Sequence, residues 1–237
     1  LEPYAFKSDR VVTVEEMAVR YAKDLCAFQS KGPYYLGGYC FGGYVAYEMA
    51  RYLENQGEQV GLLLLIDSAA PNSDYERVPW WRPAFYPRFT LNSTHWLVDF
   101  FALGARERRD FVQRKWGAVK RKARTLFANG SQPDVGFILE EYIDTTQFPE
   151  HELELWRMHL TAGATYVPKP YGGRVTLLRT RGQPFFCSFD PQYGWGNLAL
   201  AGLEVRIVPG AHERIFMEPD VQILAREVKA ALATPQS

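Results

Sequence analysis

The 237-residue chain is 47% hydrophobic and carries 27 basic and 27 acidic residues, so its formal net charge is zero. This balance gives no overall field that would attract nucleic acid or a membrane surface, and we expect neither as a partner. The longest apolar stretch, Val60–Ile66, is too short to span a bilayer. Three cysteines at unpatterned spacing, Cys26, Cys40 and Cys187, disfavour a disulfide framework, so we expect a soluble, cytoplasmic protein.

The first third of the chain predicts a helix followed by a strand, a helix and a second strand. "TVEE" at Thr13–Glu16 has the form of a capping box, and the apolar spacing continues a helix to about Gln29. Tyr34–Gly37 is a short apolar run before glycines, and Tyr44–Leu53 has the apolar spacing of a helix. "VGLLLLID", Val60–Asp67, is a continuous apolar run typical of a parallel strand buried on both faces. The last three segments together predict a βαβ unit.

The last third predicts two further strands, Gly173–Thr180 and Gly202–Gly210, and a terminal helix over Pro219–Leu232. The middle differs, because aromatic residues, prolines and helical patterns occur there without a strand followed closely by a helix. We therefore expect one domain, with a core at 1–70 and 171–237 and a helical lid inserted at about 71–170.

Gly38–Gly42, "GYCFG", has the form of the nucleophile elbow G-x-S-x-G, with cysteine in the serine position. A side chain at either glycine is expected to collide with neighbouring backbone, so only small residues fit there. The turn places Cys40 at a helix N-terminus, which favours a thiolate, and places the Phe41 N–H where an oxyanion could use it. The alternative is a glycine-rich turn with an idle cysteine.

A cysteine nucleophile needs a base, and four histidines are candidates. His212 follows a predicted strand by a short loop and precedes a helix, which places it at the carboxyl edge of the sheet with the nucleophile. His95, His151 and His159 belong to the middle region and are expected to be surface or lid-packing residues. We predict that His212 is the base.

Two aspartates could orient the histidine. Asp67 closes the strand that follows the nucleophile helix, and Asp190 follows the next predicted strand by ten residues. Asp190 precedes a proline and could equally form a turn. Spacing alone leaves the choice open.

The segments Thr13–Pro71 and Arg174–Leu232, with "LGGYCFGGYVAYEMA", "LLLLIDSAAP" and "VPGAHERIFMEP" within them, resemble the thioesterase domains that end nonribosomal peptide synthetases and modular polyketide synthases. The resemblance implies an α/β-hydrolase fold, a mostly parallel sheet flanked by helices with an inserted helical lid. It maps the nucleophile, base and acid of the family to Cys40, His212 and Asp67. It therefore favours Asp67 over an aspartate in "DPQYGWGNL".

The resemblance also implies a substrate and a partner. The substrate would be an acyl or peptidyl thioester, delivered on the phosphopantetheine of an upstream carrier domain and released by cyclisation to a lactam or lactone or by hydrolysis. No bound metal or redox cofactor is expected. The alternatives are an editing thioesterase that clears mis-primed carriers and a non-catalytic domain that binds an acyl chain.

The chain departs from the family in two places. Family members carry a strand, an oxyanion loop and a helix before the region of Leu1, whereas Leu1–Phe6 predicts one short strand. We expect the chain to be incomplete there, with the second oxyanion donor unknown. Most members have serine in place of Cys40, which is either native or a laboratory replacement. We favour a native cysteine, because transfer from a carrier thioester to a thiol is nearly isoenergetic.

Two segments of the middle region have alternative interpretations. The basic segment 105–127 is either a solvated lid helix or a surface for an acidic carrier domain, to be tested at Arg114 and Lys115. The aromatic segment 79–89, "PWWRPAFYPRF", either lines the substrate channel or packs within the lid.

Overall fold

The computed structural model describes residues 12–75, 81–104, 108–109, 111–113, 116–117, 119–120, 149–184, 187–210 and 212–233. The predicted strand at Leu1–Phe6 and the charges of Arg114 and Lys115 lie outside these ranges.

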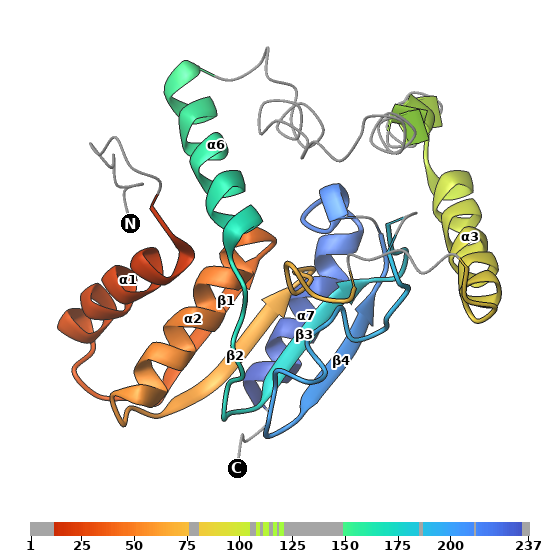
Figure 1. The fold of residues 1–237 in the computed structure, drawn as a ribbon. Coiled ribbons are helices and arrows are strands. Elements are labelled where there is room, and N and C mark those ends of the chain that lie inside the picture. The colour runs from red at the N-terminus through yellow and green to blue at the C-terminus, as the bar shows by residue number, and fades with distance from the viewer. Residues whose placement is uncertain are drawn as a thin grey trace.

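The described strands form one four-stranded sheet in the order β1-β2-β3-β4, with every neighbouring pair parallel (Figure 1). They are β1 (Tyr34–Tyr39), β2 (Val60–Ile66), β3 (Val175–Thr180) and β4 (Leu203–Val208). Tyr39 pairs with Ile66, which pairs in turn with Leu178. The register therefore brings the carboxyl ends of the strands to one edge of the sheet, and it confirms the predicted parallel strands.

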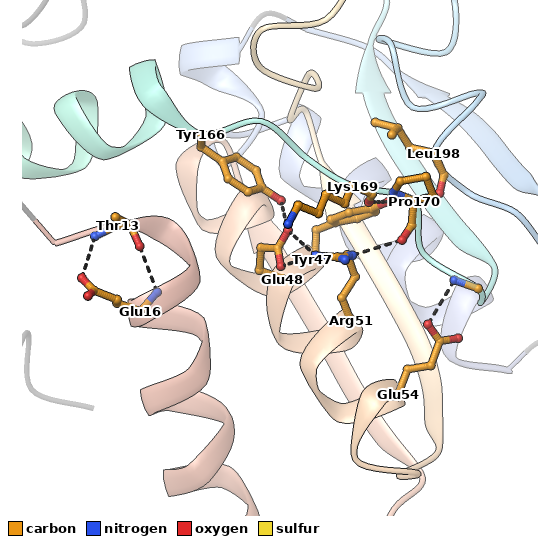
Figure 2. Close-up of polar contacts among 11 residues, drawn as sticks. Thr13, Glu16, Tyr47, Glu48, Arg51, Glu54, Tyr166, Lys169, Pro170 and Leu198 are labelled. Atoms are coloured by element: carbon orange, nitrogen blue, oxygen red, sulfur yellow. Dashed lines mark hydrogen bonds and ion pairs between the residues drawn. The ribbon is translucent and has the colours of Figure 1, made fainter.

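Three helices predicted from the sequence flank the sheet: α1 (Val14–Phe28), α2 (Phe41–Asn55) and α7 (Asp220–Ala233). Leu63 and Leu65 of β2 belong to the buried cluster that contains α2. Leu62 and Leu64 point to the other face, in the cluster that contains α7. Because successive side chains of a strand alternate between faces, the apolar run of β2 is explained by helices on both sides. The N-terminus of α1 carries the predicted capping box between Thr13 and Glu16 (Figure 2).

Between β2 and β3 the structure describes two long helices, α3 (Phe85–Ala102) and α6 (Glu150–Thr165). No strand occurs among the described residues of 71–170. Phe85 and Phe89 pack on Phe189, with ring centroids 5.2 and 6.0 Å apart. The end of the aromatic segment at 79–89 is therefore engaged in packing. No described helix is long and apolar enough to cross a membrane.

The C-terminal end of α6 is fixed to α2 by a buried polar cluster (Figure 2). Glu48 of α2 is only 6% exposed. Its carboxylate accepts a 2.7 Å hydrogen bond from the Tyr166 hydroxyl and lies 2.7 Å from the Arg51 guanidinium. Asn72, in the loop after β2, donates to the Tyr166 carbonyl at 2.7 Å. These contacts join the end of α6 to α2 and to the loop that follows β2.

Candidate active site

The chain turns sharply between β1 and α2. β1 ends at Tyr39, Cys40 has φ 50° and ψ −121°, and α2 begins at Phe41. A positive φ is uncommon for a residue with a side chain. The Cys40 N–H still donates to the Ile66 carbonyl at 3.1 Å, so the sheet fixes the turn. The half-buried thiol is thus presented at the carboxyl edge of the sheet, in the geometry of a nucleophile elbow.

The glycines of the elbow are not equivalent. A Cβ on Gly38 would collide with the carbonyl oxygen of Gly42, as expected. At Gly42 the expectation of a collision is wrong, because a Cβ there meets no described atom within 4 Å. The close approach falls instead at the next residue, where a Cβ on Gly43 would lie 2.6 Å from the Cβ of Ser68.

Asp67 follows β2 directly and also has a positive φ, 45°. Its Oδ1 accepts hydrogen bonds from the N–H and the hydroxyl of Thr180, at 2.7 and 2.9 Å. Its Oδ2 lies 2.7 Å from Nδ1 of His212. The side chain of Asp67 is buried, so Thr180 at the end of β3 and His212 beyond β4 define its orientation.

Asp190 has a different environment. Its two carboxylate oxygens accept hydrogen bonds from the main-chain N–H groups of Gln192 and Gly194, both at 2.9 Å. This is the arrangement of a turn-forming aspartate. Of the two acids left open by spacing, Asp67 is therefore the one that contacts the histidine.

Two residues that follow Asp190 form hydrogen bonds with Asp67 and with the next residue, Ser68. The Tyr193 hydroxyl donates to Oδ1 of Asp67 at 3.4 Å. Burial, followed by the negative charge of Asp67, raises the pKa of Tyr193, so this hydroxyl stays protonated. The indole N–H of Trp195 donates to the Ser68 carbonyl at 2.7 Å. Sequence reasoning missed the contributions of Thr180 and Tyr193, because neither belongs to a local motif.

His212 begins a short 3-10 helix, η2 (His212–Arg214), after β4. Burial is the largest effect on its ring and lowers its pKa, but hydrogen bonds to Asp67 and Cys40 and the charges of both residues outweigh it. The net effect raises the pKa of His212 to about 10. The arrangement of Cys40, His212 and Asp67 can thus hold an imidazolium beside the sulfur.

The other histidines occupy different places. His95 lies on α3, and the side chain of His151 lies outside the described residues. His159 of α6 stacks on Phe41, with ring centroids 4.6 Å apart and an angle of 19°. Burial lowers the pKa of His159. A lid-packing residue was expected at this position, but its contact with the residue after Cys40 could not be predicted from the sequence.

The described residues contain no group of three or more histidine, cysteine, aspartate or glutamate side chains that could hold a metal ion.

The chain is similar in sequence to known proteins. The sequence model of the thioesterase-domain family matches residues 2–231. Malpinin synthetase of Mortierella alpina is 53% identical over 224 residues, which are 91% of this chain and 2% of that protein. A non-reducing polyketide synthase of Pseudevernia furfuracea is 26% identical over 228 residues, 92% of this chain and 10% of that protein. The chain thus spans a small part of the length of these relatives.

Solved structures are similar as well. A covalent complex of the NocB thioesterase domain with a fluorophosphonate nocardicin G analog is 28% identical, with a TM-score of 0.55 over 96% of this chain and 78% of that one. The Vlm2 thioesterase domain bound with a dodecadepsipeptide, 18% identical with a TM-score of 0.55 over 98% of this chain and 81% of that one, shares the fold. The parallel sheet with helices on both faces is that of an α/β-hydrolase. The chain belongs to the thioesterase-domain family.

Proposed function

We propose that this domain releases a finished acyl or peptidyl chain from the phosphopantetheine thioester of a carrier domain, through an acyl-enzyme on Cys40. The observation that carries the proposal is the 2.7 Å contact between His212 Nδ1 and Asp67 Oδ2, beside a cysteine in an elbow with positive φ. Such an arrangement gives a nucleophile, a base and a group that orients the base. A domain that only binds an acyl chain would not need a base and an orienting carboxylate beside its thiol.

In the first half of the reaction, the Cys40 thiol gives its proton to His212 and the sulfur attacks the thioester carbonyl carbon. The new C–S bond forms while the carbonyl becomes an oxyanion. The Phe41 N–H, in the first turn of α2, is one of the donors that a helix leaves unpaired, and it stabilises this oxyanion. Collapse of the intermediate breaks the bond to the pantetheine sulfur, which leaves with the proton from His212. A second oxyanion donor is not assigned.

In the second half, neutral His212 takes a proton from water or from an amine or hydroxyl of the substrate itself. The activated nucleophile attacks the acyl-Cys40 carbonyl, and collapse of the intermediate breaks the C–S bond, so that the Cys40 sulfur leaves and takes back the proton from His212. Water gives a linear acid, and an internal nucleophile gives a lactam or lactone. We propose ring closure as a route open to this site, because a thioester on cysteine stays reactive toward amines and hydroxyls. The covalent complex formed by the NocB domain supports a covalent intermediate in a related site.

The inserted region is proposed to act as a lid, with the core at 1–70 and 171–237. In support, His159 of α6 stacks on Phe41, and a Cβ on Gly163 would lie 3.5 Å from the same ring. The helix thus contacts the residue that follows Cys40. The carrier domain is proposed as the partner, because the relatives named above are synthetases and synthases of much greater length.

The test uses a synthetic phosphopantetheinyl thioester of a peptidyl mimic, with intact-protein and product mass spectrometry. We expect an acyl adduct that maps to Cys40 and turnover that falls by about three orders of magnitude or more in Cys40→Ala. Cys26→Ala, at another half-buried cysteine, is the matched control and should keep both adduct and turnover. If the only product is the linear acid, the cyclisation route is wrong. Absence of both adduct and product would leave only a domain that binds acyl chains.

A further inference from the structure

Tyr39, the residue between Gly38 and Cys40, makes two separate contacts with His212. Its ring stacks on the imidazole, with centroids 4.7 Å apart and an angle of 24°. Its hydroxyl donates a 2.7 Å hydrogen bond to the main-chain carbonyl of His212, 173 residues away in the sequence. One side chain at the end of β1 therefore contacts both the ring and the backbone of the predicted base.

Tyr39 is itself fixed by its surroundings. It packs against the buried cluster on the α7 face of the sheet, which includes Leu64 and Ile215. The ring of Phe216 meets it edge-on, with centroids 4.9 Å apart and an angle of 89°. The position of the Tyr39 ring is thus determined by the sheet and by the segment that follows His212.

The His212 ring needs such a support. Its hydrogen bond to Asp67 uses Nδ1 and fixes one point of the ring. Hydrogen bonds lie at the edge of the ring and leave it free to tilt about the line through the bonded atoms, and such a tilt would weaken the contact with the Cys40 sulfur. A flat aromatic surface against the ring opposes this tilt, and the hydrogen bond to the carbonyl fixes the backbone from which the ring projects.

We propose that Tyr39 is a positioning residue for His212: its ring fixes the plane of the imidazole and its hydroxyl anchors the loop that carries it. The stack has an electrostatic consequence as well, because the face of a phenol ring attracts a cation and thus favours the imidazolium over the neutral ring. The inference rests on the proposed function of His212 as the base, and it adds a residue to the proposed set of Cys40, His212 and Asp67.

The variants Tyr39→Phe and Tyr39→Leu separate the two contacts, and Tyr35→Leu is the matched control. Tyr35 lies on the same strand and is 59% exposed. The readout is the pKa of His212 from NMR titration of its ring, which needs no turnover and so does not depend on the proposed reaction. We expect Tyr39→Leu to lower this pKa by about one, from about 10 in the unchanged protein, and Tyr35→Leu to leave it unchanged.

Activity on the phosphopantetheinyl thioester gives the second readout. We expect Tyr39→Leu to lower kcat about tenfold with little change in KM, and Tyr39→Phe, which keeps the stack, to lower kcat several-fold while the pKa of His212 stays. Tyr39→Phe preserves the packed volume, so it remains informative even if Tyr39→Leu does not fold. A His212 pKa in Tyr39→Leu equal to that in Tyr35→Leu overturns the role of the ring. A kcat for Tyr39→Phe equal to that of the unchanged protein overturns the role of the hydroxyl.

Discussion

Cys40 and Asp67 both have a positive φ, of 50° and 45°. Such conformations cost free energy in residues with side chains and persist only where the surrounding structure fixes them. Here the fixing groups are ladder hydrogen bonds: Cys40 donates to the carbonyl of Ile66, and Asp67 donates to the carbonyl of Leu178 at 2.7 Å. At each of these residues the chain therefore turns sharply, directly after its strand ends.

At this scale the two glycines of the elbow give a matched pair of substitutions. In Gly38→Ala the added Cβ meets the carbonyl of Gly42, so we expect a loss of roughly 1–3 kcal/mol in the free energy of unfolding and a displaced Cys40. In Gly42→Ala the Cβ enters open space in the first turn of α2, and we expect no loss, or a gain of up to about 1 kcal/mol. Urea unfolding measures both. Equal losses in the two variants would contradict this account.

At the scale of elements, α1, α2, α7 and the four strands could be predicted because each has a local period or a local end signal, such as the Thr13 capping box. The position of α6 could not, because it depends on the contact of Tyr166 with Glu48, 118 residues away. For the same reason, the local spacing could not decide whether Asp67 or Asp190 contacts the histidine. Asp67 and His212 are 145 residues apart in the sequence, and their hydrogen bond forms only in the folded chain. Local rules predict elements, while contacts between distant segments decide the site.

The contact between α6 and α2 leads to a test. Tyr166→Phe removes the 2.7 Å hydrogen bond to the buried Glu48 and leaves the carboxylate with Arg51. A buried group that loses a partner costs about 1–3 kcal/mol, so we expect the free energy of unfolding to fall by that amount. Tyr86→Phe, at an exposed tyrosine of α3, is the control and should change it by less than about 0.5 kcal/mol. If both variants unfolded alike, the hydrogen bond would not be what fixes α6.

At the scale of the whole molecule, the proposed site is assembled from the carboxyl ends of all four described strands. Cys40 follows β1, Asp67 follows β2, Thr180 ends β3, and His212 follows β4. In an open parallel sheet this edge is where the chain leaves each strand and where side chains from distant segments can meet. The site therefore requires all four described strands, and α6 contacts it through the stack of His159 on Phe41.

The burial of His159 predicts how the stability of the whole molecule depends on pH. Burial lowers the pKa of His159 from its ordinary value of 6.5, so below pH 6.5 the unfolded chain binds a proton that the folded protein resists. The free energy of unfolding should therefore fall as pH drops below 6.5, by at most about 1.4 kcal/mol per pH unit from this group. His159→Phe keeps a ring against Phe41 and removes the proton site, so urea unfolding from pH 7.5 to 4.5 should show a smaller acid loss in the variant. Above pH 6.5 both proteins should show the same pH dependence, which is the internal control. If the free energy of unfolding fell as much at low pH in the variant as in the unchanged protein, the fold would not be what keeps His159 neutral.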